Sequence, residues 1–402
     1  MNTIKQLIDK YCPDGVEYKK LGEIGFFYSG LSGKSKDDFK DGNAMFITYM
    51  NVYSNPSTKL DVIEKVKIGQ GEKQNKIEKG DILFTGSSET PDECGMSSVV
   101  TDDITSDYYL NSFCFGFRLN NKDTFEPNFL KHLFRDLKMR AQIARTANGV
   151  TRYNVSKKLF ARIIIPVPPL PVQREIVRIL DSFTSLEAEL EAELEARRKQ
   201  YEYYRDQLLS FKHLSGGGRE EVEWKTLPQI SQNLDSKRKP IKSSRRVAGM
   251  YPYYGASGIV DYVEDYIFDG DFLLVSEDGA NLLARTSKIA FSISGKNWVN
   301  NHAHVLSFND AVRRKFVEFY IENLDLSRYI SAGAQPKLTK DKLNSIPIPQ
   351  PPYEKQQEIV SILDRFESLV NDITTGLPAE IAARHQQYEY YRDQLLSFKR
   401  KS

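Results

Sequence analysis

The chain has 402 residues, more than one ordinary hydrophobic core accommodates, so two or three domains are expected. Hydrophobic residues make up 40% and charged residues 27%, as in globular proteins, and no apolar stretch reaches the ~20 residues of a membrane-spanning helix. The net charge of +2 does not by itself indicate a nucleic-acid binder, and three cysteines without metal-ligand spacing predict reduced thiols in a cytoplasmic protein.

The first globular part, expected over residues 1–165, alternates short strand-like runs with turn residues and ends in a helical stretch. MFITYM at 45–50 and FCFGFRL at 113–119 are rich in aromatic and other strand-favouring residues. The stretch NFLKHLFRDLKMRAQIA at 128–144 predicts one or two helices. We therefore expect a mixed α/β domain that is largely β.

A proline hinge and a long helix are expected next, over residues 166–214. The hinge, IPVPPLP at 165–171, disfavours helix and predicts a stiff extended entry. Between Ile176 and Phe211, apolar and aromatic residues recur at spacings that mostly alternate between three and four, which predicts a coiled-coil seam. A helix of ~38 residues would span about 57 Å and be largely polar on its other faces, so it needs a partner helix.

The second globular part, expected over residues 215–346, follows the same plan. KIAFSI at 288–293 predicts a strand, and RRKFVEFYIENL at 313–324 predicts a helix. A second hinge and helical tail are expected over residues 347–402. In that tail, Gly376 and Pro378 should kink or interrupt the helix.

The two halves repeat one another most clearly in their tails. QYEYYRDQLLSFK occurs identically at 200–212 and 387–399, and IVRILDSF at 176–183 matches IVSILDRF at 359–366. Because a globular part separates the tails, they can pair antiparallel within one chain. The predicted fold class is α+β, with two mixed α/β, largely β domains joined by two long helices in a pseudo-twofold antiparallel coiled coil.

Short motifs that resemble catalytic sites lack the required context. YSGLSGKS at 28–35 has Tyr28 where a phosphate-binding loop needs glycine. QPPY at 350–353 is similar to a methyltransferase motif, but no Gly-rich cofactor-binding turn accompanies it. NNHAH at 300–304 has two histidines but no nearby third ligand, which favours a base-reading or structural role over metal binding. We therefore predict no catalytic residue and no metal site.

Taken together, the repeated hinges and tails resemble the specificity subunits of type I restriction–modification systems. Both halves carry P-P-x-x-x-Q-x-x-I-V-x-I-L-D, starting at Pro168 and Pro351, and a helix that ends in QLL. GVTRYNV at 149–155 corresponds to GAQPKLT at 333–339 ahead of the hinges. The run YPYYGASGIVDYVEDYIFDGDFLLVSEDGANL at 251–282 is similar to one common kind of target-recognition domain.

This resemblance implies a non-catalytic, sequence-specific DNA-binding subunit. Each globular part would be a target-recognition domain that reads one half of a bipartite double-stranded DNA site, and the helices would set the spacer. Two modification (methyltransferase) subunits would methylate a flipped adenine in each half-site, and restriction/translocase subunits would cleave DNA with ATP. S-adenosylmethionine, ATP and Mg are expected on those partners and no cofactor on this chain. The alternatives are a standalone enzyme and a structural or adhesive repeat protein without DNA binding.

Candidate DNA contacts are polar residues in Gly-rich or post-strand loops, because base edges are read by donors and acceptors and phosphates by basic groups. In the first half they are Lys34, Lys36, Ser87, Ser88, Asn111, Arg152 and Tyr153. In the second half they are Tyr254, Ser257, Asp278, Asn281, Arg285, Asn301, His302, Gln335 and Lys337. The alternative for each is a loop residue that satisfies its own turn. Basic residues also crowd the segments 131–162 and 237–246.

Apolar and aromatic residues of the tails are candidates for the coiled coil and for docking the modification subunits. They are Ile176, Phe183, Leu190, Tyr201, Tyr204, Leu208, Phe211, Ile359, Phe366, Ile373, Tyr388, Tyr391, Leu395 and Phe398.

Overall fold

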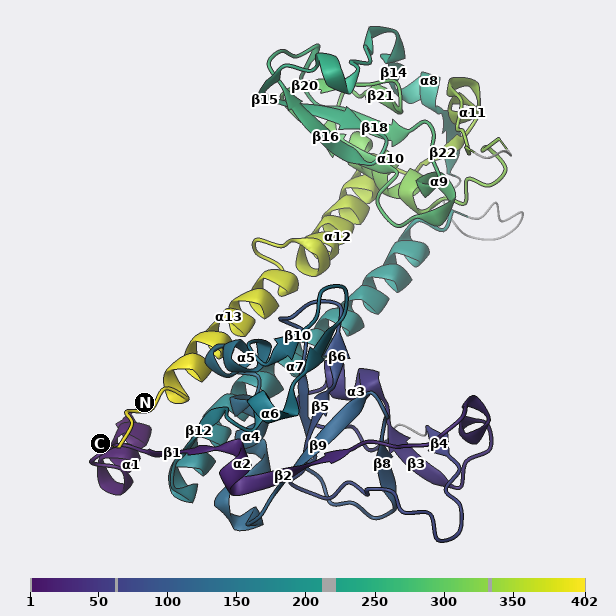
Figure 1. Cartoon of the computed structure of the whole chain (residues 1–402). Coiled ribbons are helices and arrows are strands. Elements are labelled where there is room, and N and C mark those ends of the chain that lie inside the picture. The colour runs from purple at the N-terminus through teal and green to yellow at the C-terminus, as the bar shows by residue number, and fades with distance from the viewer. Residues whose placement is uncertain (1, 62–63, 212–221, 332–334, 402) are drawn as a thin grey trace, which may run out of the picture. The chain divides into compact units, whose positions relative to one another are not determined.

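The computed structural model describes residues 2–61, 64–211, 222–331 and 335–401 (Figure 1). These residues form two compact units: unit 1 comprises residues 1–190 and 381–402, and unit 2 comprises residues 191–380. Each unit therefore combines one globular domain with segments of both helical tails. The domain boundary that the sequence places between residues 214 and 215 lies outside the described residues.

Unit 1 begins with a short helix and then builds its domain from short strands. Its elements are α1 (Asn2–Tyr11), β1 (Glu17–Lys20), α2 (Leu21–Ile24), β2 (Gly25–Ser29), β3 (Ala44–Ile47), α3 (Tyr49–Ser54), β4 (Lys65–Val66), β5 (Ile82–Thr85), β6 (Ser87–Ser88), β7 (Ser97–Val99), β8 (Tyr108–Leu110), β9 (Cys114–Leu119), α4 (Pro127–Leu133), α5 (Leu137–Ala144), β10 (Ala147–Asn148), β11 (Tyr153–Val155), α6 (Lys157–Phe160), β12 (Ile164–Val167) and the start of α7 (Leu170–Leu208).

An antiparallel sheet in the order β2-β9-β5-β7 carries the core of unit 1. Phe84 on β5 lies opposite Phe115 on β9, and their ring centroids are 5.4 Å apart. The ring of Phe160 lies 4.8 Å from Phe84 and 5.5 Å from Phe115. A second sheet, β4-β3-β8, pairs β3 in parallel with β8. Phe115 and Phe117 of the FCFGFRL run therefore face an aromatic core, as expected of a strand.

One predicted strand is shorter than its sequence suggests. MFITYM reads as a continuous strand, but β3 ends at Ile47 and α3 begins at Tyr49. The Oγ1 of Thr48 accepts a hydrogen bond from the backbone N–H of Asn51 at 3.1 Å and caps the new helix. The stretch at 128–144 forms two helices, α4 and α5, because Asp136 caps the second one.

Unit 2 repeats this arrangement around different side chains. Its elements are β13 (Glu223–Thr226), α8 (Leu227–Ile230), β14 (Gln232–Asn233), β15 (Ala248–Gly255), β16 (Gly258–Val263), β17 (Phe268–Asp269), β18 (Phe272–Ser276), α9 (Asn281–Ala284), β19 (Ala290–Ile293), β20 (Lys296–Val299), β21 (Ala303–Ser307), α10 (Ala311–Asn323), α11 (Lys340–Asn344), β22 (Pro347–Gln350), α12 (Tyr353–Asn371) and the start of α13 (Leu377–Leu395).

The core sheet of unit 2 matches that of unit 1 strand for strand, whereas its second sheet has four strands, β16-β15-β20-β17, where unit 1 has three. The core sheet has the order β14-β21-β18-β19, and β18 is antiparallel to both of its neighbours, as β5 is in unit 1. In the second sheet, β15 pairs in parallel with β20, as β3 does with β8. The helix α10 packs against β18 and β19 and also against α12. The two domains therefore share one frame.

Both proline hinges form strands that close their domains. β12 pairs with β1 and places Pro166 opposite Tyr18, and β22 pairs with β13 and places Pro349 opposite Trp224. Each pair is a separate two-stranded sheet, where a strand can lack proline N–H donors without breaking a larger ladder. The extended entries predicted from the prolines are confirmed.

The two tails differ in continuity. The first is a single helix, α7, of 39 residues, in agreement with the predicted length. The second is interrupted between Asn371, where α12 ends, and Leu377, where α13 begins. Asp372 accepts a hydrogen bond from the N–H of Thr374 at 2.7 Å within this break. A Cβ on Gly376 would lie only 2.5 Å from the carbonyl oxygen of Ser368, so the break requires glycine. The interruption predicted at Gly376 and Pro378 is confirmed.

Helix pairing is antiparallel within unit 1. The rings of Phe183 and Tyr391 stack with centroids 5.1 Å apart. One turn further along α7, the Oε1 of Glu187 lies 2.9 Å from the Nδ1 of His385. Rising numbers on α7 thus meet falling numbers on α13.

Helix pairing in unit 2 has the same direction. Phe366 on α12 contacts Tyr201 and Tyr204 on α7, with centroid distances of 6.4 and 5.7 Å. Directly after α7, Leu209 is buried in one cluster with Ile359. The predicted antiparallel coiled-coil segments are therefore present in both units. Among the described residues, no helix is both long and apolar enough to cross a membrane.

Candidate nucleic-acid interface

Four of the predicted contact residues of unit 1 gather where β6 meets β11. Tyr153 is the register partner of Ser88. The guanidinium of Arg152 donates to the Oγ of Ser87 at 3.0 and 3.2 Å and lies 5.8 Å above the ring of Phe113. Next to these strands is a groove of about 440 Å³, lined by Tyr49, Met50, Tyr53, Ser87, Ser88, Glu89, Glu93, Thr151 and Arg152.

Exposed apolar side chains accompany this groove. Val150, in the turn between β10 and β11, is 89% exposed, and Met50 on the groove wall is 60% exposed. Phe113, beneath Arg152, is 59% exposed. Sequence reasoning missed all three: Met50 and Phe113 lie in runs that predict strands, and Val150 lies in a motif that served only to match the two halves. Exposed apolar residues beside a basic group suit contact with bases rather than with water.

The other candidates in unit 1 have different environments. The ammonium group of Lys34 lies 2.6 Å from Glu72, its side chain is only 7% exposed, and the pKa of Glu72 falls to about 2 through hydrogen bonds from Lys34, Gln74 and Gly69. The Oδ1 of Asn111 accepts from the N–H of Phe113 at 2.9 Å. Lys34 and Asn111 therefore satisfy their own loops, whereas Lys36 is exposed.

Candidates of unit 2 converge at the equivalent edge of its core sheet. The Nδ1 of His302 lies 2.9 and 3.0 Å from the two carboxylate oxygens of Asp278. Asp278 forms a β-bridge with Lys337, whose ammonium group lies 3.1 Å from Glu277. The exposed side chains of Asn301 and Gln335 belong to the same loops. The fold thus brings together residues from three separate segments.

Tyr254 and Ser257 adjoin this loop cluster, because the N–H of Asn300 donates to the carbonyl of Tyr254 at 3.1 Å. Ser257 lies exposed in the turn between β15 and β16. Two further candidates, Asn281 and Arg285, form hydrogen bonds within the domain. The amide of Asn281 donates to the carbonyl of Ser287 at 2.9 Å, and Arg285 donates to two carbonyls at the end of α10, at 3.1 and 2.8 Å.

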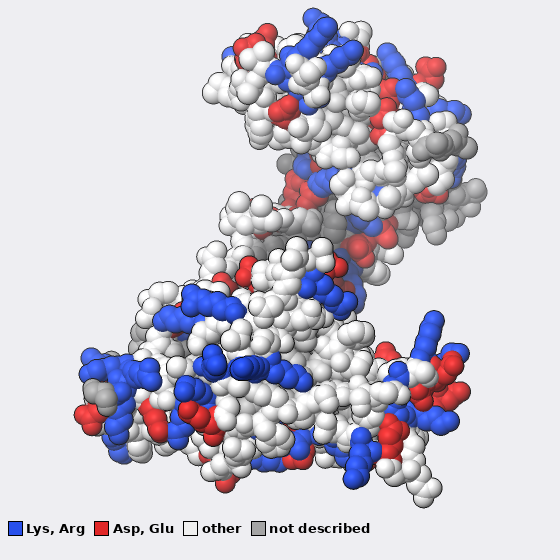
Figure 2. Space-filling view, in the orientation of Figure 1, with Lys and Arg blue, Asp and Glu red and all other residues white. Residues whose placement is uncertain are grey.

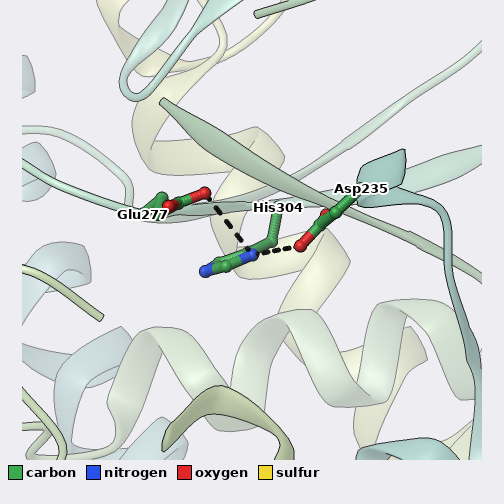
Figure 3. Close-up of side chains that lie close together, drawn as sticks. All are labelled: Asp235, Glu277 and His304. Carbon is green, nitrogen blue, oxygen red and sulfur yellow. Dashed lines mark hydrogen bonds and ion pairs between the residues drawn. The ribbon is translucent and has the colours of Figure 1, made fainter. Parts of the chain in front are cut away.

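Beneath the loops of unit 2, Asp235, Glu277 and His304 form a buried cluster (Figure 3). The Nδ1 of His304 lies 2.7 Å from Asp235, and its Nε2 lies 2.8 Å from the carbonyl oxygen of Leu338. Both ring nitrogens of His304 are thus engaged in hydrogen bonds within the domain. Arg238 pairs with Glu277 at 2.6 Å. The arrangement is a buried ion-pair cluster that supports the loops.

Charges within this cluster stabilise one another. Burial raises the pKa of Asp235, but hydrogen bonds from His304 and from the backbone of Val305 outweigh it, so the pKa lies below its ordinary value. The pKa of Glu277 is likewise lowered: burial opposes the shift, and bonds from Arg238 and Lys337 dominate. His304 therefore has the structural role that was one of the two alternatives for NNHAH, whereas His302 in the same motif is exposed.

Several basic residues of segment 131–162 are also used internally. Arg135 donates to the carbonyls of Ser97 and Tyr53, and Arg140 donates to those of Gly95, Asp92 and Cys94. Burial lowers the pKa of each guanidinium to about 10. On the face shown in Figure 2, Lys and Arg are interspersed with Asp and Glu on both units. Basic residues in sequence therefore do not translate directly into a basic surface.

The tail residues lie mostly in the helix seams or under the domains. Ile176 and Ile359 are fully buried, whereas Ile373, in the break before α13, is 81% exposed. Sequence reasoning missed two outward-facing residues of the identical stretch: Tyr203 is 61% exposed and its repeat equivalent Tyr390 is 59% exposed. The sequence could have indicated them, because they are the tyrosines of the identical stretch that do not occupy seam positions.

Comparison with known proteins identifies the family. A family model for the type I restriction modification DNA specificity domain matches the chain twice, over residues 13–196 and 219–383. A putative type I restriction enzyme specificity subunit of Haemophilus influenzae is 43% identical over 181 residues, which cover 44% of this chain and 46% of that protein. A type I restriction enzyme specificity subunit of Escherichia coli is 39% identical over 269 residues, covering 61% of this chain and 64% of that protein.

Solved structures share the fold over nearly the whole chain. The S subunit of a type I restriction-modification system from M. genitalium is 15% identical with a TM-score of 0.56, covering 95% of this chain and 96% of that chain. The HsdS subunit from Thermoanaerobacter tengcongensis is 19% identical with a TM-score of 0.53, covering 95% and 96% of the two chains. Two matched specificity domains on one repeated frame show that the chain belongs to the type I restriction–modification DNA specificity family.

Proposed function

We propose that this chain is the DNA-reading subunit of a type I restriction–modification complex, with each domain reading one half of a bipartite site. The observation that carries the proposal is the repeated frame: each unit holds one copy of the specificity domain and presents a cluster of loop residues at the same edge of its core sheet. Diverged loops on a common frame suit two different half-sites.

The helical tails would set the spacer between the half-sites. Both tails continue directly from a domain-closing strand, so each domain is fixed to its helix by a short connection. The seam side chains pair the helices within each unit, which limits how far a helix can slide along its partner. A stiff connection of this kind favours one spacing and disfavours others.

The chain would perform no chemistry itself and would assemble with two modification subunits and with restriction/translocase subunits. S-adenosylmethionine, ATP and Mg would be bound by those partners, in the cytoplasm. Tyr203 and Tyr390 are the best candidates for docking the modification subunits, because identical stretches offer identical outward-facing tyrosines. Tyrosine is enriched at protein–protein interfaces, where it combines an apolar ring with a hydrogen-bonding group.

Methylome sequencing of cells that carry the gene with its partner genes tests the proposal. We expect modified adenines within a bipartite motif whose two halves are separated by a fixed number of unspecified base pairs. Footprinting of the purified complex should show the same split, and binding should weaken steeply as salt rises. A single contiguous footprint, or a chain that assembles with no methyltransferase, would contradict it.

Deleting residues 373–376 tests the helices as a ruler. The deletion removes most of the break between α12 and α13. We expect the required spacer to change or binding to be lost, while the base preference of each half-site stays the same. Ile373→Ser is the control, because it alters an exposed side chain in the same segment and keeps the chain length unchanged. An unaltered spacer in the deletion variant would refute a role of the helices in setting distance.

A further inference from the structure

Phe113 in unit 1 and His302 in unit 2 lie in turns that are held by the same hydrogen bonds. In unit 1, the Oδ1 of Asn111 accepts from the N–H of Phe113 at 2.9 Å, and in unit 2 the Oδ1 of Asn300 accepts from the N–H of His302 at 2.8 Å. The carbonyl oxygens are matched as well: that of Phe113 accepts from Gly86 at 2.7 Å, and that of His302 accepts from Glu277 at 2.8 Å.

Strand registers confirm that these positions are equivalent. Thr85 on β5 lies opposite Cys114, one residue after Phe113. Ser276 on β18 lies opposite Ala303, one residue after His302. The turn thus enters the core sheet at the same point of the frame in both units. A backbone held at both its N–H and its C=O presents the side chain in a fixed position at low entropic cost.

Each unit also fixes the ring from the neighbouring loop. Ser87 and Asp278 occupy equivalent positions, since each lies one residue after the N–H donor named above. Ser87 binds Arg152, whose guanidinium covers the ring of Phe113. Asp278 binds the Nδ1 of His302 directly. Both rings stay accessible: Phe113 is 59% exposed, and the His302 side chain is 47% exposed.

The chemistry that the two rings offer is different. Asp278 accepts the Nδ1–H of His302, and among the described residues no group is hydrogen-bonded to its Nε2. That atom can accept from the exocyclic amino group of cytosine or adenine when the ring is neutral, and donate to guanine when it is charged. Phe113 has no polar atom to offer and suits the methyl group of thymine.

We infer that Phe113 and His302 are specificity-determining residues, each of which contacts a base edge in its own half-site. The inference rests on the proposed function and adds to it the residues and atoms that distinguish the two halves. Phe113 favours an apolar base feature, and the Nε2 of His302 favours a hydrogen-bonding one. The Asn-held turn would then be the constant part, and the residue two positions after the asparagine the variable part.

Reciprocal substitutions test this inference. The variants His302→Phe and Phe113→His are assembled with their modification subunits, and methylation is measured on DNA duplexes randomised in both half-sites. We expect the preference at one or two base pairs to change by about tenfold or more, only in the half-site read by the altered unit. His302→Gln, which keeps a hydrogen-bonding group, should give a third preference at the same position.

Matched controls separate base reading from other effects. His385→Phe removes a histidine that is also exposed and also bound through Nδ1 to a carboxylate, at 2.9 Å, but on α13. Phe26→His alters a phenylalanine that is 50% exposed on β2. Neither control should change any base preference.

The outcomes also separate the inference from the function on which it rests. If both reciprocal variants keep every base preference, the inference is wrong. An equal loss of affinity for all sequences in His302→Phe, with a weaker salt dependence, would show that His302 contacts a phosphate. If the unaltered complex shows no base preference, the proposed function fails, and the inference fails with it.

Discussion

Phe115 and His304 occupy the same buried position in the two domains and solve its packing in opposite ways. Each is the second residue of the strand that follows the asparagine-held turn. Phe115 lies opposite Phe84 in its sheet, and His304 lies opposite Val275. Phe115 packs among other phenylalanines, whereas His304 donates to Asp235 and to the carbonyl of Leu338. One frame therefore accepts an aromatic core in unit 1 and a buried ion-pair cluster in unit 2.

This difference shows which parts of the fold are common to the two units and which parts differ. Backbone pairing, the closing hinge strands and the helix seams are common to both units, and the interior beneath the reading loops is free to change. Since a loop changes shape with the layer beneath it, such divergence gives the two units different loop surfaces without disturbing the shared frame. Exchanging residues between the two interiors measures how independent they are.

The largest effect is expected from exchanging the buried pair. His304→Phe leaves Asp235 buried without its main partner and should lower the free energy of unfolding by about 3–5 kcal/mol. Phe115 is only 3% exposed, so Phe115→His places a polar ring among buried phenylalanines. This variant should lower the free energy of unfolding by about the same amount. Urea unfolding of the purified chain measures both.

The double variant His304→Phe with Asp235→Leu is the control for the ion-pair explanation. Replacing both partners by apolar groups removes the unpaired charge, so stability should largely recover. If the double variant is as unstable as the sum of its single variants, the loss comes from packing of the larger ring and the ion-pair explanation is wrong.

The frame was predictable from the sequence because its signals are local and repeated. The spacing of Ile176, Ile179 and Phe183 predicts the seam whatever the domains contain, and Gly376 with Pro378 predicts the break in the second helix. Proline-rich hinges likewise predict extended backbone from φ restriction alone. These elements depend on neighbours within a few residues.

The environments of the candidate contact residues were not predictable because they depend on distant partners. Lys34 looks like an exposed basic residue until the fold brings Glu72 to it. His302 and His304 stand two residues apart in one motif, yet one is exposed and the other is buried. Phe113 looks like the first residue of a strand, but its N–H donates to the side chain of Asn111 in the turn before β9. Contacts of this kind are set by the tertiary fold.

A smaller effect, dependent on pH, is expected where α4 meets the tails. Lys131 pairs with Asp181 at 2.8 Å in unit 1, and Lys315 pairs with Asp364 at 3.4 Å in unit 2. The residue after each lysine differs: His132 bonds to Asp181 and to the hydroxyl of Tyr388, at 2.7 and 2.9 Å, whereas the equivalent Phe316 is apolar. Unit 1 therefore has a histidine beside this lysine–aspartate pair, and unit 2 has a phenylalanine in its place.

Burial lowers the pKa of His132 below its ordinary value, despite the bond to Asp181. The unfolded chain thus binds this proton at higher pH than the folded chain, so stability should fall as pH drops below about 6.5. The lowered pKa of Asp181, where bonds from His132 and Lys131 outweigh burial, should add a second loss below about pH 4.

His132→Phe should abolish the loss near pH 6.5, and at neutral pH it should cost about 1–3 kcal/mol because the hydroxyl of Tyr388 loses its partner. Phe316→His is the reciprocal variant and should create a new loss on acidification. Urea unfolding between about pH 5 and about pH 8 measures both. A wild-type profile that stays flat across this interval would exclude His132 as the titrating group.

The smallest effect on stability, and the most informative one for assembly, is expected from Tyr203 and Tyr390. Both side chains are mostly exposed and contact chiefly the neighbouring tyrosine ring, so Tyr203→Ala and Tyr390→Ala should each change stability by less than about 0.5 kcal/mol. If the same partner binds both copies of the repeat, each single variant should lower the partner stoichiometry from two to about one, and the double variant should bind none. Native mass spectrometry of the assembled complex counts the subunits.

Tyr204→Ala is the matched control, since its ring packs on Phe366 in the helix seam. It should reduce stability and leave stoichiometry unchanged. Two partners retained on the double variant would show that the identity of the two stretches serves the helix seam alone, because the outward positions would then have no function that requires them to match.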